Sequence, residues 1–151
     1  MSAGTQLDLG DHSLRVVWPV AESFVEPGND SSVVVSLEPV TTCEGCVSAL
    51  FLGDLGEQPQ QILLGRERFT ARDVVKVSHH GSRDQFEGLY QVLAAEIGLI
   101  GVGSENTYGH PTQGALDILE RSGTRAMRSD ERGIMALSRA PDGTLNIWSE
   151  R

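Results

Sequence analysis

The sequence has no run of apolar residues that approaches the ~20 needed to span a bilayer. Its first residues, MSAGTQLDLGD, lack the basic segment and following apolar stretch of a secretory signal peptide. We therefore expect a soluble chain without a signal peptide or membrane segment, whose compartment the sequence leaves open.

Basic residues are also few, with 12 Lys and Arg against 21 Asp and Glu and a formal net charge of -9. Nonspecific DNA binding depends on neutralising phosphates with Lys and Arg, so this charge argues against a DNA-binding module that acts alone. The negative charge argues less against an enzyme that holds a DNA strand through bound metal ions.

Cysteine is limited to one pair, Cys43 and Cys46 in the segment TTCEGC. One C-x-x-C pair supplies half of a four-ligand zinc site, and the sequence has no second pair. We interpret the segment as a polar hairpin loop that holds two thiols. A small disulfide and half of a metal knuckle remain as alternatives, and the redox state of the pair is open.

The length and composition predict one folded domain over residues 1–151. The chain has 39% hydrophobic and 22% charged residues, which excludes a disordered or fibrous protein. Strands that alternate with helices indicate an α/β layered domain. Expected strands cover residues 13–18, 32–37, 47–52, 74–77, 97–102, 125–127, 134–137 and 145–148, and expected helices cover residues 57–64, 84–95 and 112–122.

Polar or small residues gather in three segments, LFLGDLG, KVSHHGSRDQ and GSENTYGHP. Each follows an expected strand or precedes an expected helix, and binding groups of α/β proteins collect at strand ends. In the first segment, Asp54 lies between Gly53 and Gly56 directly after an apolar strand. Its carboxylate is either a turn residue or a metal ligand, and the pattern alone favours the turn.

His79 and His80 end the expected strand 74–77, before Gly81 and Ser82. Successive strand residues point to opposite faces, so we expect at most one of the two imidazoles to face a given site. Imidazole is a common ligand of divalent transition metals, while the plain alternative is a pair of surface histidines.

In the third segment, Pro111 keeps His110 out of the helical region and fixes the loop. Asn106 or His110 would then bind an anion or support a neighbouring site. The alternative is a scaffolding role, in which Asn106 bonds the local backbone.

Taken in order, the segments NDSSVVVSL, LFLGDLGEQPQQILL, VVKVSHHGS and GVGSENTYGHP, followed by RSD and a closing strand pair, resemble a known family. They are similar to the second half of the soluble domain of ComEC competence (DNA-uptake) proteins, which belongs to the metallo-β-lactamase superfamily. The resemblance runs from about Val16 to Leu137. VSHHGS and NTYGHP are its specific motifs, and the GD pair is a weak one.

The resemblance implies the C-terminal half of a four-layer αββα sandwich that binds zinc or manganese at one edge. By it, Asp54 matches the aspartate that bridges two metal ions, and His79 matches the late metal histidine, with His80 as the second choice. The remaining motif positions would support the site or contact substrate; they are His80, Ser82, Asn106, Tyr108 and His110. The implied activity is metal-dependent phosphodiester hydrolysis on DNA during competence uptake.

The sequence departs from the family in one large respect. The main ligand motif, H-x-H-x-D-H, is absent, because only His12 precedes His79. One Asp and one His cannot hold a catalytic dinuclear centre, since each metal needs three or more protein ligands. We therefore expect a fragment that is inactive alone, with a sheet face that another chain or a second copy covers. The alternatives are a non-catalytic binding or assembly module and an intact small hydrolase with a minimal site.

Overall fold

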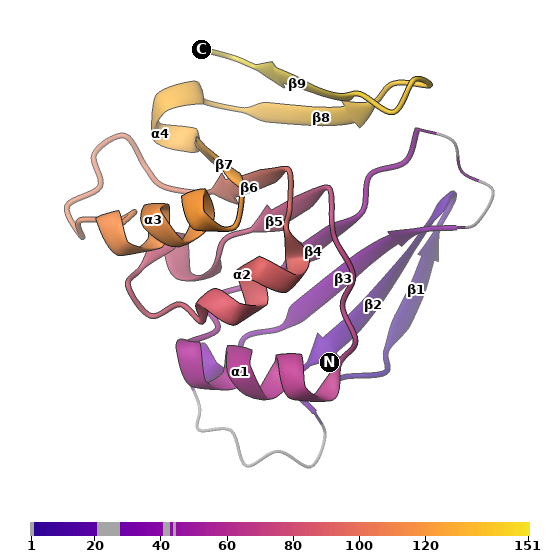
Figure 1. Cartoon of the computed structure of the whole chain (residues 1–151), viewed down its shortest axis with the longest axis horizontal. Coiled ribbons are helices and arrows are strands. Elements are labelled where there is room, and N and C mark those ends of the chain that lie inside the picture. Colours follow the sequence, from indigo (N-terminus) through magenta and orange to yellow (C-terminus); the bar gives the residue numbers. More distant parts are fainter. Residues whose placement is uncertain (1, 21–27, 41–42, 44) are drawn as a thin grey trace.

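A seven-stranded mixed sheet forms the centre of the computed structural model, which describes residues 2–20, 28–40, 43 and 45–151 (Figure 1). The strand order is β1-β2-β3-β4-β5-β6-β7. Strands β1 to β4 pair antiparallel, and β4 to β7 pair parallel. The strand bounds are β1 Gln6–Leu9, β2 His12–Trp18, β3 Val34–Pro39, β4 Ala49–Phe51, β5 Val74–Lys76, β6 Ile97–Ile100 and β7 Arg125–Arg128.

Helices connect the parallel strands and lie on one side of the sheet (Figure 1). They are α1 Glu57–Arg66, α2 Glu87–Leu93 and α3 Gln113–Arg121. The short elements are the 3-10 turns η1 Asn29–Ser31 and η2 Ser78–Gly81 and the helix α4 Ser129–Arg132. The chain closes with the antiparallel hairpin of β8 Met135–Arg139 and β9 Leu145–Ser149. Within the described ranges, every helix is too short or too polar to cross a bilayer.

Helix α3 begins as its sequence predicts. The hydroxyl of Thr112 accepts a hydrogen bond from the backbone N–H of Ala115 and caps the first turn. Gly123, with a φ of 72°, follows the helix in the left-handed conformation that suits a helix end.

Two apolar layers stabilise the sheet, one on each face. On the helix side, Leu50, Val75 and Ile100 join the main core. On the other side, the buried residues Ala49, Val74, Ile97 and Met127 form a second cluster. The inward face of the β8–β9 hairpin packs against this cluster through Met135, Leu137, Leu145 and Ile147.

The hairpin leaves uncovered part of the face of the seven-stranded sheet on which it packs. Leu7 pairs with Leu14 and Phe51 pairs with Val35, so the strand registers place these side chains on the face opposite the helices. Leu7 is 59% exposed and Phe51 is 38% exposed. The expected open sheet face is thus confined to the region of β1 and the end of β4, because the chain's own hairpin covers the buried cluster of β4 to β7.

The predicted α/β class is confirmed, and each expected strand and helix is present with shifted bounds. The expected strand 97–102 ends at Ile100, and the expected helix 84–95 begins only at Glu87. Sequence analysis missed β1 and α4. Strand β1 has only four residues, all exposed, so its alternation of Leu7 and Leu9 with polar residues is too short to indicate a strand, and α4 is a single helical turn.

Candidate functional site

The three polar segments meet at one edge of the sheet, where the parallel strands end. Asp54 follows β4, His79 and His80 follow β5, and the loop from Gly101 to His110 follows β6. Because β4, β5 and β6 are parallel neighbours, their carboxyl ends lie side by side. The structure therefore brings Asp54 and the histidine pair to one edge of the sheet, as the resemblance implied for Asp54 and His79, while a shared metal position for these two residues stays a prediction.

His80 is the histidine that approaches Asp54. Its Nε2 atom lies 3.9 Å from Oδ1 of Asp54. Its Nδ1 atom lies 2.5 Å from the carbonyl oxygen of Gly101, which can only accept a hydrogen bond. Nδ1 therefore carries a proton, and Nε2 is the ring nitrogen that faces the carboxylate. A backbone carbonyl that fixes the tautomer in this way is the usual support of a metal-binding histidine.

His79 takes a different direction. Its Nδ1 atom lies 3.3 Å from the amide nitrogen Nδ2 of Asn29, in the turn η1. Its backbone N–H donates to the carbonyl of Gly53, at 3.1 Å. His79 is thus held between the β4 loop and η1, and the prediction that it binds metal stays untested.

The expected strand alternation at the two histidines is wrong. Both lie in the turn η2, with φ values of 44° for His79 and 54° for His80. These are left-handed conformations that residues with a side chain seldom adopt, and such strain concentrates at functional sites. As a result, both imidazoles reach the same pocket instead of opposite faces of the sheet.

A network of buried polar side chains holds the turn η2 in place through hydrogen bonds. The hydroxyl of Ser78 donates to the carbonyl of Leu55 at 2.6 Å, and the amide of Gln85 donates to the carbonyl of Ser78 at 3.0 Å. The Tyr90 hydroxyl donates to the side-chain oxygen of Gln85. Burial raises the pKa of Tyr90, so the phenol remains a donor. Sequence analysis missed this network, whose only sequence signal was the apolar spacing that placed Tyr90 on the inner face of a helix.

Ser82 belongs to the support of the turn, because it is only 6% exposed. Its hydroxyl accepts from the backbone N–H of Asp84 at 3.3 Å, and its carbonyl accepts from the amide of Gln85 at 3.1 Å. Its expected role of supporting the site fits these contacts better than substrate contact does.

Asn106 holds the third loop together. Its Nδ2 donates to the carbonyl of His110 at 2.5 Å, and its Oδ1 accepts from the backbone N–H of Tyr108 at 3.0 Å. Both ends of the amide are therefore bonded to the loop backbone, which is the scaffolding role that the sequence left open. The loop holds Tyr108 with 85% of its surface exposed.

His110 lies beside His79, with the two ring centroids 5.7 Å apart. Its Nδ1 atom is buried and has no hydrogen-bond partner among the described residues. Desolvation by burial, followed by the proximity of His79 and His80, lowers the pKa of His110. The ring therefore stays neutral at lower pH than an ordinary histidine.

A pocket of about 660 Å³ opens between the histidine turn and the third loop. This volume falls within the range of small-molecule sites, about 300–1,000 Å³. The lining residues are His79, His80, His110 and the continuous run 101–108.

Lys76 places a cation beside the candidate ligands. Its Nζ atom lies 3.8 Å from Oδ1 of Asp54 and donates to the carbonyl of Gly53 at 2.8 Å. Burial lowers the pKa of Lys76, and the charge of Asp54 partly restores it. An ammonium group at this position competes with a divalent cation for the carboxylate.

The described residues do not by themselves fit a resident metal ion. In that part of the chain, no group of three or more His, Cys, Asp or Glu side chains could hold one. A catalytic zinc needs three protein ligands, whereas the Asp54–His80 pair supplies two and is neutralised in part by Lys76.

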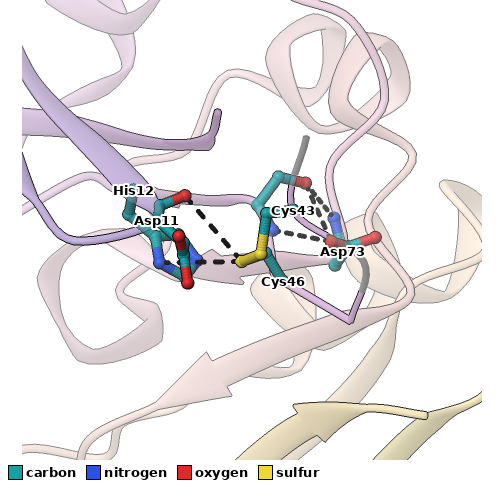
Figure 2. The surroundings of a disulfide bond; sticks show 6 residues. Asp11, His12, Cys43, Cys46 and Asp73 are labelled. Carbon is teal, nitrogen blue, oxygen red and sulfur yellow. Dashed lines mark hydrogen bonds between the residues drawn. A yellow bond between two sulfur atoms is a disulfide. The ribbon is translucent and has the colours of Figure 1, made fainter. Parts of the chain in front are cut away.

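The cysteine pair lies at another place, in the connection between β3 and β4, and forms a disulfide (Figure 2). The interpretation as two free thiols is therefore wrong, because the turn brings the Cα atoms of Cys43 and Cys46 within 5.8 Å. Sγ of Cys46 lies 3.8 Å from the carbonyl oxygen of Asp11 and 4.0 Å from Nδ1 of His12, as Figure 2 shows. The other residues of TTCEGC except Gly45 lie outside the described residues.

Comparison with known proteins finds one relevant similarity. The chain is 32% identical to ComE operon protein 3 of Bacillus subtilis (strain 168) over 133 residues. The aligned region is 87% of this chain and 16% of that protein, so the chain spans a small part of its relative. No protein-family model and no solved structure matches the chain. The similarity supports the link to ComE-type proteins that the motifs indicated, and it tests neither the metallo-β-lactamase fold nor a hydrolytic activity.

Proposed function

We propose that this chain is the C-terminal half of a ComEC-type metallo-β-lactamase domain, with a role in competence and DNA uptake. In this proposal it contributes an incomplete metal-binding edge to a phosphodiesterase site and is hydrolytically silent alone. The similarity to ComE operon protein 3 supports the uptake role. The α/β layered fold and the motif order support the half-domain.

The observation that carries the proposal is the geometry of Asp54 and His80. A carboxylate oxygen and an imidazole nitrogen from adjacent strand ends lie 3.9 Å apart, and the carbonyl of Gly101 holds the ring with its Nε2 atom towards the carboxylate. Two ligands that both approach one divalent cation at about 2 Å lie at a similar separation. We therefore assign the histidine ligand to His80, where the motif comparison preferred His79.

The uncovered sheet face supports the view that another segment completes the domain. Leu7 and Leu9 of β1 and Phe51 of β4 expose apolar surface on the face opposite the helices. Exposed apolar surface of this kind, when it is contiguous, marks interaction sites. A segment that packs there is well placed to complete the sandwich, and the proposal requires such a segment to bring the missing ligands.

The test is a titration of the purified chain with Zn²⁺ and with Mn²⁺ by calorimetry, together with a hydrolysis assay on single-stranded DNA. We expect one weak site per chain and no hydrolysis. Asp54→Asn and His80→Ala should each weaken metal binding at least about tenfold, since loss of even a supporting residue costs about 10–100-fold. The exposed carboxylate of Asp8 offers a matched control, and Asp8→Asn should bind like the unmodified chain.

The outcomes separate the candidate functions. Loss of binding in His79→Ala but not in His80→Ala would reverse the histidine assignment. Absence of binding, or equal binding by Asp54→Asn, would contradict the metal edge. Two tightly bound ions with turnover would instead support an intact small hydrolase.

A further inference from the structure

The pocket beside the histidine turn carries a more specific inference about the substrate, which rests on the proposed function. The pocket is lined by a loop that Asn106 holds through hydrogen bonds, by the imidazoles of the histidine turn and by the exposed ring of Tyr108. These features indicate which chemical class of ligand fits the pocket.

The charge of the pocket disfavours a phosphate group as its natural occupant. Among the described residues that line it, none is Lys or Arg, and the one carboxylate is that of Glu105. Phosphate binding in proteins depends on cationic side chains or clustered backbone donors. A neutral occupant with hydrogen-bonding edges suits the lining better, because Glu105, Ser104 and Thr107 offer polar groups to such edges.

Tyr108 gives the pocket an aromatic wall. It lines the pocket and is 85% exposed, more than any other large apolar side chain that the structure describes. An exposed ring is a stacking platform for a nucleobase, and such stacking contributes about 1–3 kcal/mol per base in single-strand binding.

The loop that presents this ring is already ordered. The side-chain amide of Asn106 bonds the backbone at both Tyr108 and His110. Ordering of a loop on binding costs free energy, so a loop that is held in advance keeps more of the stacking energy for affinity.

The pocket also adjoins the candidate hydrolytic edge. His80 lines the pocket with its ring and points Nε2 to Asp54. A base held in the pocket therefore brings the neighbouring backbone of its strand to the Asp54–His80 pair.

We propose that this pocket binds one unpaired nucleobase of single-stranded DNA, with Tyr108 as the stacking residue. A base in a duplex is stacked on both faces and does not reach such a pocket. The pocket therefore selects single strands and positions the adjoining phosphodiester for the site.

The experiment measures binding to the whole chain in EDTA, which removes any metal contribution. The probes are the uncharged nucleoside thymidine, a labelled pentathymidylate, the same oligomer with a central abasic position, and inorganic phosphate. We expect thymidine and the pentathymidylate to bind, the abasic oligomer to bind about tenfold more weakly, and phosphate not to compete. Between 50 and 200 mM salt the affinity should change little, because few phosphates are neutralised.

Variants locate the contact. Tyr108→Ala should weaken pentathymidylate binding about tenfold, equivalent to about 1.4 kcal/mol, and Tyr108→Phe should retain it because stacking needs the ring and not the hydroxyl. Trp148, 59% exposed on the β8–β9 hairpin, is the matched control, and Trp148→Ala should bind normally.

Equal binding of the abasic and intact oligomers, competition by phosphate, or equal behaviour of Tyr108→Ala and Trp148→Ala would overturn the proposal. Its failure is distinct from failure of the proposed function. Metal binding that depends on Asp54 would survive loss of the nucleobase site, and nucleobase binding in EDTA would survive loss of the metal edge.

Discussion

Replacement of Gly81 by Ala tests whether the histidine turn and the third loop form one unit. Gly81 has a φ of 77°, and a Cβ atom added there would lie 2.6 Å from Cβ of Pro111 and 3.2 Å from its Cα. The carbonyl of Gly81 also accepts hydrogen bonds from the backbone N–H of Thr112 at 2.8 Å and from its hydroxyl at 3.2 Å. The two segments are therefore packed with no space for one methyl group.

The expected loss has two parts. A left-handed conformation costs a residue with a side chain about 1–2 kcal/mol. Insertion of a methyl group into a well-packed place costs about 1–3 kcal/mol more. Gly81→Ala should therefore lower the free energy of unfolding by about 2–5 kcal/mol, and the urea midpoint by about 1 M or more, for an m-value of about 2 kcal/mol/M.

The control separates the conformational part from the steric part. Gly109 also has a left-handed φ, of 73°, but a Cβ atom added there would have no neighbouring atom within 4 Å. Gly109→Ala should therefore lose only about 1–2 kcal/mol. If urea unfolding shows that Gly81→Ala loses no more than Gly109→Ala, the close contact between the histidine turn and Pro111 does not exist.

The disulfide and His110 provide the remaining predictions. Cys43 and Cys46 are three positions apart, so the closed loop is short and chain entropy predicts that the double serine variant loses at most about 2 kcal/mol. A larger loss in urea unfolding of the double serine variant would contradict this. For His110 the folded state lowers the pKa, so the unfolded chain binds more protons as pH falls below the ordinary value of about 6.5. Stability should therefore decline from pH 7.5 to 5.5, and less steeply in His110→Gln; identical pH profiles would show that this ring does not contribute.

Much of the fold follows from local sequence. β-branched runs such as SVVVSL predicted the strands, and the spacing of Leu89, Tyr90 and Leu93 predicted the inner face of a helix. Asp54 and His79 were predicted to converge because each follows a predicted strand and the family resemblance places both at one edge, and strand ends are where binding groups of α/β proteins gather. These inferences hold because they depend on the period of the backbone and on strand ends, which the order of residues specifies.

Other features were decided only in the tertiary structure. The choice between His79 and His80 depends on two left-handed residues, on Asn29, 50 positions before His79, and on the carbonyl of Gly101. The ammonium of Lys76 beside Asp54 depends on the register of β4 and β5.

Only the tertiary structure showed that the β8–β9 hairpin covers part of the sheet face opposite the helices. Arg139 of β8 pairs with Asp73, 66 positions away, and with Glu96, and so holds the hairpin at the start of the parallel strands. Residue order determined most of the strands and the three longer helices, and it placed the polar segments at strand ends. Packing between distant segments determined which side chains face one another there, because such contacts depend on the positions of whole elements and leave no periodic signal in the sequence.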